Sequence, residues 1–244
     1  MNICLFTAEE INKPLSIKDE RGQHLIKVLH KKAGETFAAG VIGGMAGRAT
    51  IEKIEDDKIF FSFAEETDGK NLFPLKVIIG FPRPIQLKRL LRDMAALGVA
   101  EVHLTKTELT EKSYLDSDLA TTDAGKKMLL DGTVQAASTH VPGLFIHRSL
   151  KECIDFIKEN SAAGIKLCAL DNVEPETNLG SLKFSRDCGA VAAIGSERGW
   201  TTKERLLLKE SGFILLGMGS RVMRTETAAT VACSIILNGM GCLS

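Results

Sequence analysis

The spacing of apolar residues changes along this chain near residue 70. Before that point, short apolar segments with the character of strands are separated by turn signals, and they cover residues 3–7, 35–41, 47–55 and 58–64. One further segment, residues 23–29, instead carries its apolar residues at the spacing of one side of a helix. The pattern predicts a small N-terminal β-barrel, residues 1–70, interrupted by one helix.

A polar stretch at residues 65–74 reads as a linker, and beyond it strands and helices alternate. Apolar strands are predicted at residues 76–81, 101–104, 165–170, 190–194 and 213–216, and helices at residues 86–97, 123–139, 150–160, 201–210 and 225–238. Such alternation is typical of a parallel α/β sheet with helices on both faces. We therefore expect a second domain of the α/β class over residues 71–244.

Three of the predicted strands end in glycine or in acidic residues. Leu170 is followed by Asp171, Ile194 by the segment 195–199 (GSERG), and Leu216 by Gly217. Glycine lets a backbone approach a ligand closely, and ligands of parallel sheets bind beyond the carboxyl ends of the strands. The three endings together predict the floor of a ligand site.

Several common nucleotide and hydrolase motifs are missing from these endings. The chain has no GxGxxG after its first parallel strand, no GxxxxGK[ST] and no GxSxG. A dinucleotide site, a P-loop or a nucleophile elbow is therefore not expected. A cofactor held mainly by backbone atoms from several loops fits the pattern better.

The balanced charge of the chain means that any contact with nucleic acid must come from a local basic patch. The chain has 31 basic and 31 acidic residues, so no overall basic field attracts a polyanion. The candidate local patch comprises Arg83, Lys88, Arg89 and Arg92. These cations either bind nucleic-acid phosphates or form an ordinary solvent-exposed helix face. The sequence is compatible with both interpretations.

The cysteines and the N-terminus narrow the class of protein further. The six cysteines are scattered, with no CxxC pair and no histidine at ligand spacing, so no metal site is expected. The first residues lack the pattern of a secretory signal, and no apolar run approaches the length that crosses a membrane. We expect a cytoplasmic protein.

The C-terminal third carries a family resemblance. Residues 194–204 (IGSERGWTTKE), 215–217 (LLG) and 221–228 (RVMRTETA) resemble motifs of the bacterial 16S ribosomal RNA uridine N3-methyltransferase (RsmE-like) family, within the SPOUT superfamily. Weaker matches lie at residues 23–30 (QHLIKVLH), 97–99 (LGV) and 135–137 (QAA). The resemblance thus covers nearly the whole chain.

This resemblance implies a PUA-like, RNA-binding β-barrel followed by a SPOUT domain with a C-terminal deep trefoil knot. It also implies a homodimer that methylates N3 of a uridine in 16S rRNA, in the decoding region of the 30S subunit, with S-adenosylmethionine as the cofactor. Carried over position by position, the cofactor contacts are Leu170, Ile194, Gly195, Glu197, Gly199, Leu216, Gly217, Val222 and Met223.

The same resemblance locates the chemistry before the last helix. A uridine N3 must lose its proton before it attacks a methyl group, so a cation beside the base is needed. Arg224 is the predicted stabiliser of the developing imidate oxygen, and Arg221 is the second candidate. Glu226 either orients the arginine or accepts the proton, and residues 225–228 also fit an ordinary capped helix start.

Some positions differ from the family pattern, and these keep two other functions open. The differences are Ser196 and Arg198 for a proline and a glycine, Val222 and Met223 for isoleucine and leucine, His30 for arginine, Ala96 for glutamate, and a residue near His140 for arginine. One alternative is a SPOUT methyltransferase that modifies a different rRNA or tRNA nucleotide. The other is a non-catalytic RNA-binding relative, against which the retained Gly195 and Glu226 argue.

Overall fold

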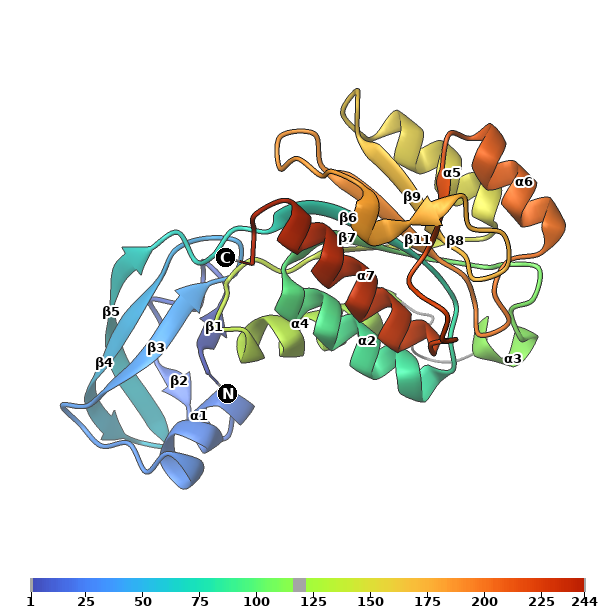
Figure 1. Cartoon of the computed structure of the whole chain (residues 1–244). Helices are drawn as coiled ribbons and strands as arrows, with labels where there is room; N and C mark the ends of the chain where they lie inside the picture. Colours follow the sequence, from blue (N-terminus) through green and yellow to red (C-terminus); the bar gives the residue numbers. More distant parts are fainter. Residues whose placement is uncertain (1, 116–121, 244) are drawn as a thin grey trace. The chain divides into compact units, whose positions relative to one another are not determined.

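The chain folds into two compact units. The computed structural model describes residues 2–115 and 122–243 (Figure 1). The first unit contains the residues up to 71 together with residues 131–141, and the second contains residues 72–130 and those from 142 onward. Hydrogen bonds join the two segments of the first unit to each other. The Thr139 amide and the Ser138 hydroxyl donate to the Gly69 carbonyl at 2.9 and 3.0 Å.

The first unit is built on a five-stranded sheet. Its strands are β1 (Cys4–Phe6), β2 (Leu15–Ser16), β3 (Thr36–Val41), β4 (Ala46–Glu55) and β5 (Lys58–Thr67), in the order β1-β3-β4-β5-β2. Only the β1–β3 pair is parallel. Buried Phe6, Leu25, Phe37, Ile51 and Ile59 are among the side chains that form its core. The four strands expected from the sequence are confirmed, and the two-residue β2 is additional.

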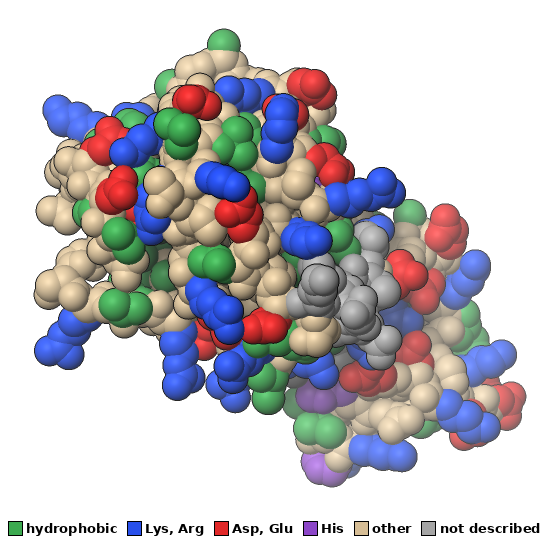
Figure 2. All heavy atoms as spheres, turned by 90° about the vertical axis from the view of Figure 1, so that its right-hand side faces the viewer, with side chains coloured by type: hydrophobic (Ala, Val, Ile, Leu, Met, Phe, Trp, Pro, Cys, Tyr) green, Lys and Arg blue, Asp and Glu red, His purple; other side chains and the backbone are tan. Residues whose placement is uncertain are grey.

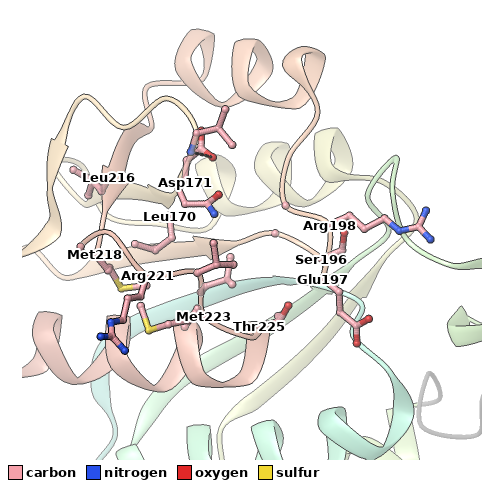
Figure 3. Close-up of a pocket in the computed structure, with 18 of the residues that line it drawn as sticks. Leu170, Asp171, Ser196, Glu197, Arg198, Leu216, Met218, Arg221, Met223 and Thr225 are labelled. Atoms are coloured by element: carbon pink, nitrogen blue, oxygen red, sulfur yellow. Dashed lines mark hydrogen bonds between the residues drawn. The ribbon is translucent and has the colours of Figure 1, made fainter.

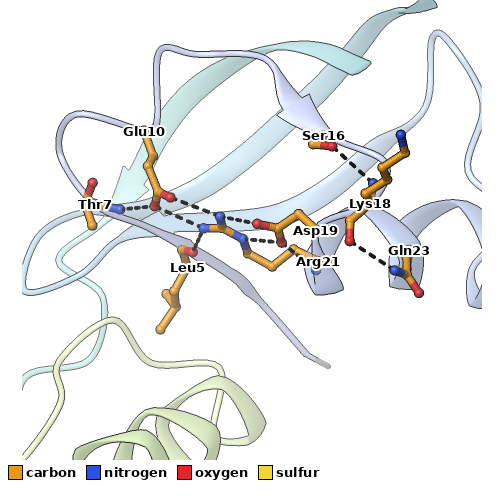
Figure 4. Close-up of polar contacts among 8 residues, drawn as sticks. All are labelled: Leu5, Thr7, Glu10, Ser16, Lys18, Asp19, Arg21 and Gln23. Atoms are coloured by element: carbon orange, nitrogen blue, oxygen red, sulfur yellow. Dashed lines mark hydrogen bonds and ion pairs between the residues drawn. The ribbon is translucent and has the colours of Figure 1, made fainter. Parts of the chain in front are cut away.

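The helix expected at residues 23–29 begins earlier and has a wider last turn. It consists of α1 (Glu20–Gln23) and the π-helical η1 (His24–Val28). Arg21 fixes its start: the guanidinium binds the carboxylates of Glu10 and Asp19 and donates to the Leu5 carbonyl at 2.8 Å (Figure 4). The pKa values of both carboxyls lie below their usual range because Arg21 donates to them. Arg21 therefore ties α1 to β1 by charge-assisted hydrogen bonds.

The second unit contains a seven-stranded sheet in which all strand pairs are parallel. The strands are β6 (Phe73–Gly80), β7 (Val99–Thr105), β8 (Gly143–His147), β9 (Lys166–Leu170), β10 (Thr177–Asn178), β11 (Ala190–Ile194) and β12 (Ile214–Gly217), in the order β10-β12-β9-β11-β6-β7-β8. The parallel α/β sheet expected from the sequence is confirmed. The edge strands β8 and the two-residue β10 were not expected from the sequence.

Helices cover both faces of this sheet. The longer ones are α2 (Pro84–Leu97), α4 (Thr122–Gln135), α5 (Leu150–Glu159), α6 (Thr202–Glu210) and α7 (Thr225–Gly239), and α3 (Lys112–Leu115) and the 3₁₀ turn η3 (Leu179–Ser181) are short. α2 and α7 lie on one face, and α5 and α6 lie on the other (Figure 1). The expectation that α4 continues to residue 139 was wrong, because Ala137 takes a positive φ of 52° and residues 138 and 139 bond to Gly69 instead.

The strand register brings the three predicted strand endings together. Ile194 pairs with Leu170, and Leu170 pairs with Leu216, so β11, β9 and β12 end side by side. Parallel strands in one register expose their carboxyl ends along the same edge of the sheet. The loops that follow these three residues therefore surround one place.

A chain of polar side chains, partly buried at Lys76 and Glu101 and fully buried at its two histidines, lies on the α5 side of β7 and β8. The Lys76 ammonium binds the Glu101 carboxylate at 3.1 Å, His103 Nε2 donates to Glu101 at 2.9 Å, and His103 Nδ1 lies 3.1 Å from His147 Nε2. Both imidazoles are buried, and the Phe145 ring stacks on His103. Burial, helped by the neighbouring His103, lowers the pKa of His147.

Stability is expected to fall as the pH decreases from about 7 to about 5, because the unfolded chain binds a proton at an unperturbed histidine near pH 6.5 while folded His147 resists protonation. His147→Leu should make this slope shallower. Urea unfolding of the full chain at several pH values measures it. The control is His30→Asn, at an exposed position, which should leave the dependence of stability on pH unchanged. Equal slopes for His147→Leu and wild type would contradict the interpretation.

Candidate functional site

A cavity of about 330 Å³ lies at the carboxyl edge of β9, β11 and β12 (Figure 3). Eight of the nine residues predicted to contact a cofactor line it. They are Leu170, Ile194, Gly195, Glu197, Gly199, Leu216, Val222 and Met223. The ninth, Gly217, lies between the lining residues Leu216 and Met218 but does not itself line the cavity. The cavity is within the usual size range of small-molecule sites.

Glycine is required twice in the turn that follows β11. A Cβ on Gly195 would lie 2.9 Å from the Gly199 carbonyl carbon, and Gly199 has a φ of +72°, which favours glycine. The Gly199 amide closes the turn by donating to the Ser196 carbonyl at 2.8 Å. The turn therefore presents backbone to the cavity, as the sequence predicted.

Ser196 and Arg198, the two unusual residues of this turn, have different surroundings. The Ser196 hydroxyl is buried and lacks a hydrogen-bond partner within the described chain, and Ser196 lines the cavity. The Arg198 side chain points away from the cavity, and its guanidinium binds Glu111 at 2.9 Å (Figure 3). The guanidinium of Arg198 consequently leaves the cavity open.

A buried ion pair that the sequence analysis missed supports the β9 side of the cavity. Arg205, from α6, donates to both carboxylate oxygens of Asp171 at 2.6 and 3.2 Å. Burial alone would raise the pKa of Asp171, but Arg205 and the amides of Val173 and Glu174 outweigh it, and the pKa lies below its usual range. The Asp171 amide also donates to the Leu216 carbonyl at 3.0 Å. The ion pair thus ties the end of β9 to α6, and the Asp171 amide ties it to the end of β12.

A second pocket, of about 460 Å³, adjoins the first cavity. It is lined by Arg83, Gln86, Glu197, Val222, Met223, Arg224, Thr225 and Glu226. Glu197, Val222, Met223 and Thr225 line both spaces, so they form a common wall. Val222 is 81% exposed as a residue, so its apolar surface is available to a ligand.

The three predicted catalytic residues are divided between the two spaces. Arg221 lines the first cavity, whereas Arg224 and Glu226 line the second pocket at the start of α7. Arg221 and Arg224 are exposed, and neither guanidinium has a hydrogen bond or ion pair within residues 2–115 and 122–243. Arg224 is therefore the unpaired cation of the second pocket among the residues that the structure describes.

The four cations of the predicted patch do not share one environment. Arg83 precedes α2, lines the second pocket and binds Glu197 at 3.2 Å and the Tyr114 hydroxyl at 3.1 Å. The other three, Lys88, Arg89 and Arg92, lie exposed along α2 and line neither space. On the face drawn in Figure 2, basic side chains are interspersed with acidic ones. The structure thus separates Arg83 from the rest of the patch.

Three side chains of metal-ligand type meet away from these spaces. His103, His147 and Cys153 come from β7, β8 and α5, are all buried, and place their ligand atoms within 4.8 Å of one another. Their wide separation in sequence explains why spacing motifs did not identify them.

Among the described residues, no helix combines the length and apolarity needed to cross a bilayer.

Comparison with known proteins places this site in context. A family model described as an RNA methyltransferase domain matches residues 69–237. The chain is 41% identical to ribosomal RNA small subunit methyltransferase E of Treponema pallidum, covering 97% of this chain and 91% of that protein. It is 35% identical to ribosomal RNA small subunit methyltransferase E 1 of Borreliella burgdorferi, covering 97% of each.

A solved structure supports the fold. The ribosomal RNA small subunit methyltransferase E from Neisseria gonorrhoeae, in a crystal structure bound to S-adenosyl methionine, matches with a TM-score of 0.79 at 18% identity. The match covers 98% of this chain and 97% of that one. The mixed α/β fold predicted from the sequence is confirmed.

Replacement of Arg205 by methionine should lower the free energy of unfolding by about 3–5 kcal/mol, because it leaves the buried Asp171 carboxylate without its cation. Chemical denaturation measures the loss. Lys203→Met, at an exposed position of the same helix, is the control and should change stability by no more than about 0.5 kcal/mol. A loss for Arg205→Met as small as that of the control would contradict a structural role for the pair.

Proposed function

The chain belongs to the ribosomal RNA small subunit methyltransferase E family, and on this premise we propose that its two adjoining spaces divide the reaction between them. The protein is an rRNA methyltransferase that uses S-adenosylmethionine. We assign the cavity beside β9, β11 and β12 to the cofactor and the pocket beside Arg224 to the target base. The observation that carries this assignment is the common wall, because methyl transfer needs donor and acceptor to meet across a short gap.

The proposed cofactor site suits a molecule with an adenosine part and a charged end. Leu170, Ile194 and Leu216 give apolar walls, and the Gly195–Gly199 turn offers backbone groups. The buried Ser196 hydroxyl adds a polar contact to the set carried over from the family. Gly217, the last residue of β12, does not line the cavity, and a Cβ there would lie 3.3 Å from the Pro175 Cβ. When bound, the cofactor supplies an electrophilic methyl group on a sulfonium.

We propose N3 of a uridine in 16S rRNA as the acceptor, which by family resemblance is uridine 1498 of the decoding region. Arg224 then stabilises the charge that develops on a uracil oxygen as the N3 proton leaves. Glu226, in the first turn of α7, either accepts that proton or orients Arg224. Arg221 lines the cofactor cavity and remains the second candidate for the cationic role.

The RNA-binding surface is also a proposal. The exposed Lys88, Arg89 and Arg92 on α2 are positioned to bind phosphates of the rRNA that surrounds the target nucleotide. Arg83 acts differently in this scheme, because its ion pair with Glu197 fixes part of the common wall. A target base that is unpaired or loosely paired enters the pocket at low cost.

Further features are proposed from the family. They are a PUA-like RNA-binding barrel at residues 1–70, a SPOUT domain at residues 71–244, a deep C-terminal trefoil knot, a homodimer, action on the 30S subunit, a cytoplasmic location and methyl transfer without a metal. One arrangement supports the knot: β12 lies on one side of β9, whereas α7 packs against β11 and β6 on the other side. The 3₁₀ turn η3, which lies between β10 and β11 in the chain, also contacts α7.

Purified protein is expected to bind S-adenosylmethionine in calorimetry and to methylate 30S subunits from cells that lack it. Mass mapping of the product nucleoside then identifies the methylated atom. Methylation of naked rRNA or tRNA in place of 30S subunits would favour a different SPOUT substrate. No binding at high micromolar cofactor would contradict both methyltransferase assignments and favour a non-catalytic relative.

Arg224→Ala should reduce kcat by about 100-fold while cofactor affinity stays unchanged, because the proposed contact forms with the base and not with the methyl donor. Single-turnover methylation and calorimetry measure the two effects separately. Arg148→Ala removes an exposed arginine that lines neither space and is the matched control. A normal rate for Arg224→Ala would show that the catalytic assignment is wrong.

A further inference from the structure

Gln86 carries an unsatisfied acceptor at the proposed base pocket. It lies in the first turn of α2, lines the pocket together with Arg224 and Glu226, and its side-chain Oε1 is buried. No hydrogen-bond donor reaches this oxygen within residues 2–115 and 122–243. Buried polar atoms are normally paired, and Gln86 lines the pocket, so a rotation of its side-chain amide toward the pocket would let a ligand supply the missing donor.

The chemistry of a uridine nucleotide limits what that donor is. Its phosphate, its ring oxygen and the O2 and O4 carbonyls of uracil only accept hydrogen bonds. The donors are N3–H and the ribose 2′-hydroxyl. Because N3 must lose its proton and face the methyl donor, a side chain on N3–H would block the reaction. The 2′-hydroxyl is the donor that remains.

Neighbouring acceptors of the pocket are less suited to this contact. The Glu197 carboxylate already binds the Arg83 guanidinium at 3.2 Å. Glu226 is assigned to the proton or to Arg224, and a carboxylate near the target phosphate also costs electrostatic repulsion. The Gln86 amide accepts a hydrogen bond without carrying charge.

We propose that Gln86 Oε1 accepts a hydrogen bond from the 2′-hydroxyl of the target nucleotide. This contact selects ribose over deoxyribose and fixes the sugar, so that the base lies with N3 toward the cofactor cavity. Gln86 is thereby a positioning and specificity residue for the target sugar. The inference rests on the proposed function and goes beyond it by naming the group that is recognised.

The test is a double-mutant cycle with full-length protein and 30S subunits reconstituted from ligated rRNA fragments. The subunits carry either ribose or 2′-deoxyribose at the methylated nucleotide. Wild type should lose about tenfold in kcat/KM on the deoxy substrate, as expected for one hydrogen bond left unmade. On the ribose substrate, kcat/KM of Gln86→Leu should be about tenfold below that of wild type. On the deoxy substrate, the two proteins should have the same kcat/KM.

Two variants and one binding measurement keep the outcome clear. Gln86→Glu retains an acceptor and should still discriminate between the two sugars, although its overall rate falls. Gln135→Leu, an exposed glutamine that lines neither space, should behave as wild type. Cofactor affinity by calorimetry should be the same for all four proteins, which also shows that each is folded.

Discrimination by Gln86→Leu as strong as that of wild type would overturn the inference, and so would loss of discrimination by Gln86→Glu. These outcomes leave the proposed function intact, since wild type still methylates the ribose substrate. Failure of wild type to methylate either substrate would instead contradict the proposed function, and the inference with it.

Discussion

Leu170 pairs in register with Ile194 on one side and with Leu216 on the other, and the position of every other part of the site follows from this alignment. Because parallel strands present their carboxyl ends at one edge, the loops after β9, β11 and β12 have to meet there. The Asp171 amide, which donates to the Leu216 carbonyl, extends the alignment one residue beyond the strands. A shift of one residue in β9 would point Leu170 toward the opposite face and separate the walls of the cavity.

Polar contacts, of which the first two below are buried and the third is largely exposed, then hold the loops in the places that the register gives them. Arg205 reaches from α6 to Asp171, and the Trp200 indole N–H donates to the Leu170 carbonyl at 2.9 Å. Arg83 reaches from the start of α2 to Glu197. Each contact joins a loop at the carboxyl edge to a helix, to the start of a helix or to the end of a strand. The site is consequently preorganised by side chains that do not themselves carry the proposed chemistry.

The sequence allowed the sheet, most of its helices and the cavity floor to be predicted, because these depend on local signals. Continuous apolar runs identify β9 and β11, and the glycines of the 195–199 turn are required by that turn itself. Strand β8 was missed because its apolar run is only three residues long, between Gly143 and His147, and it lies at the sheet edge.

The remaining features depend on contacts between distant parts of the chain. Asp171 and Arg205 are separated by 34 residues, and His103 and His147 by 44. No spacing rule joins residues so far apart. The direction of the Arg198 side chain likewise depends on Glu111, 87 residues away, and so could not be read from the motif in which Arg198 lies.

The arginines of the site differ in a way that matches the charge changes of the proposed reaction. Arg83, Arg198 and Arg205 each bind a carboxylate, whereas Arg221 and Arg224 have no partner within the described residues. Methyl transfer from a sulfonium to a uracil imidate destroys one positive and one negative charge, so the anion exists only while the base is in the pocket. A cation that was already paired would have to break its ion pair at that moment, at a cost in activation free energy. An unpaired, solvent-exposed Arg224 exchanges only water for the developing imidate oxygen, and this favours it over the paired arginines as the catalytic cation.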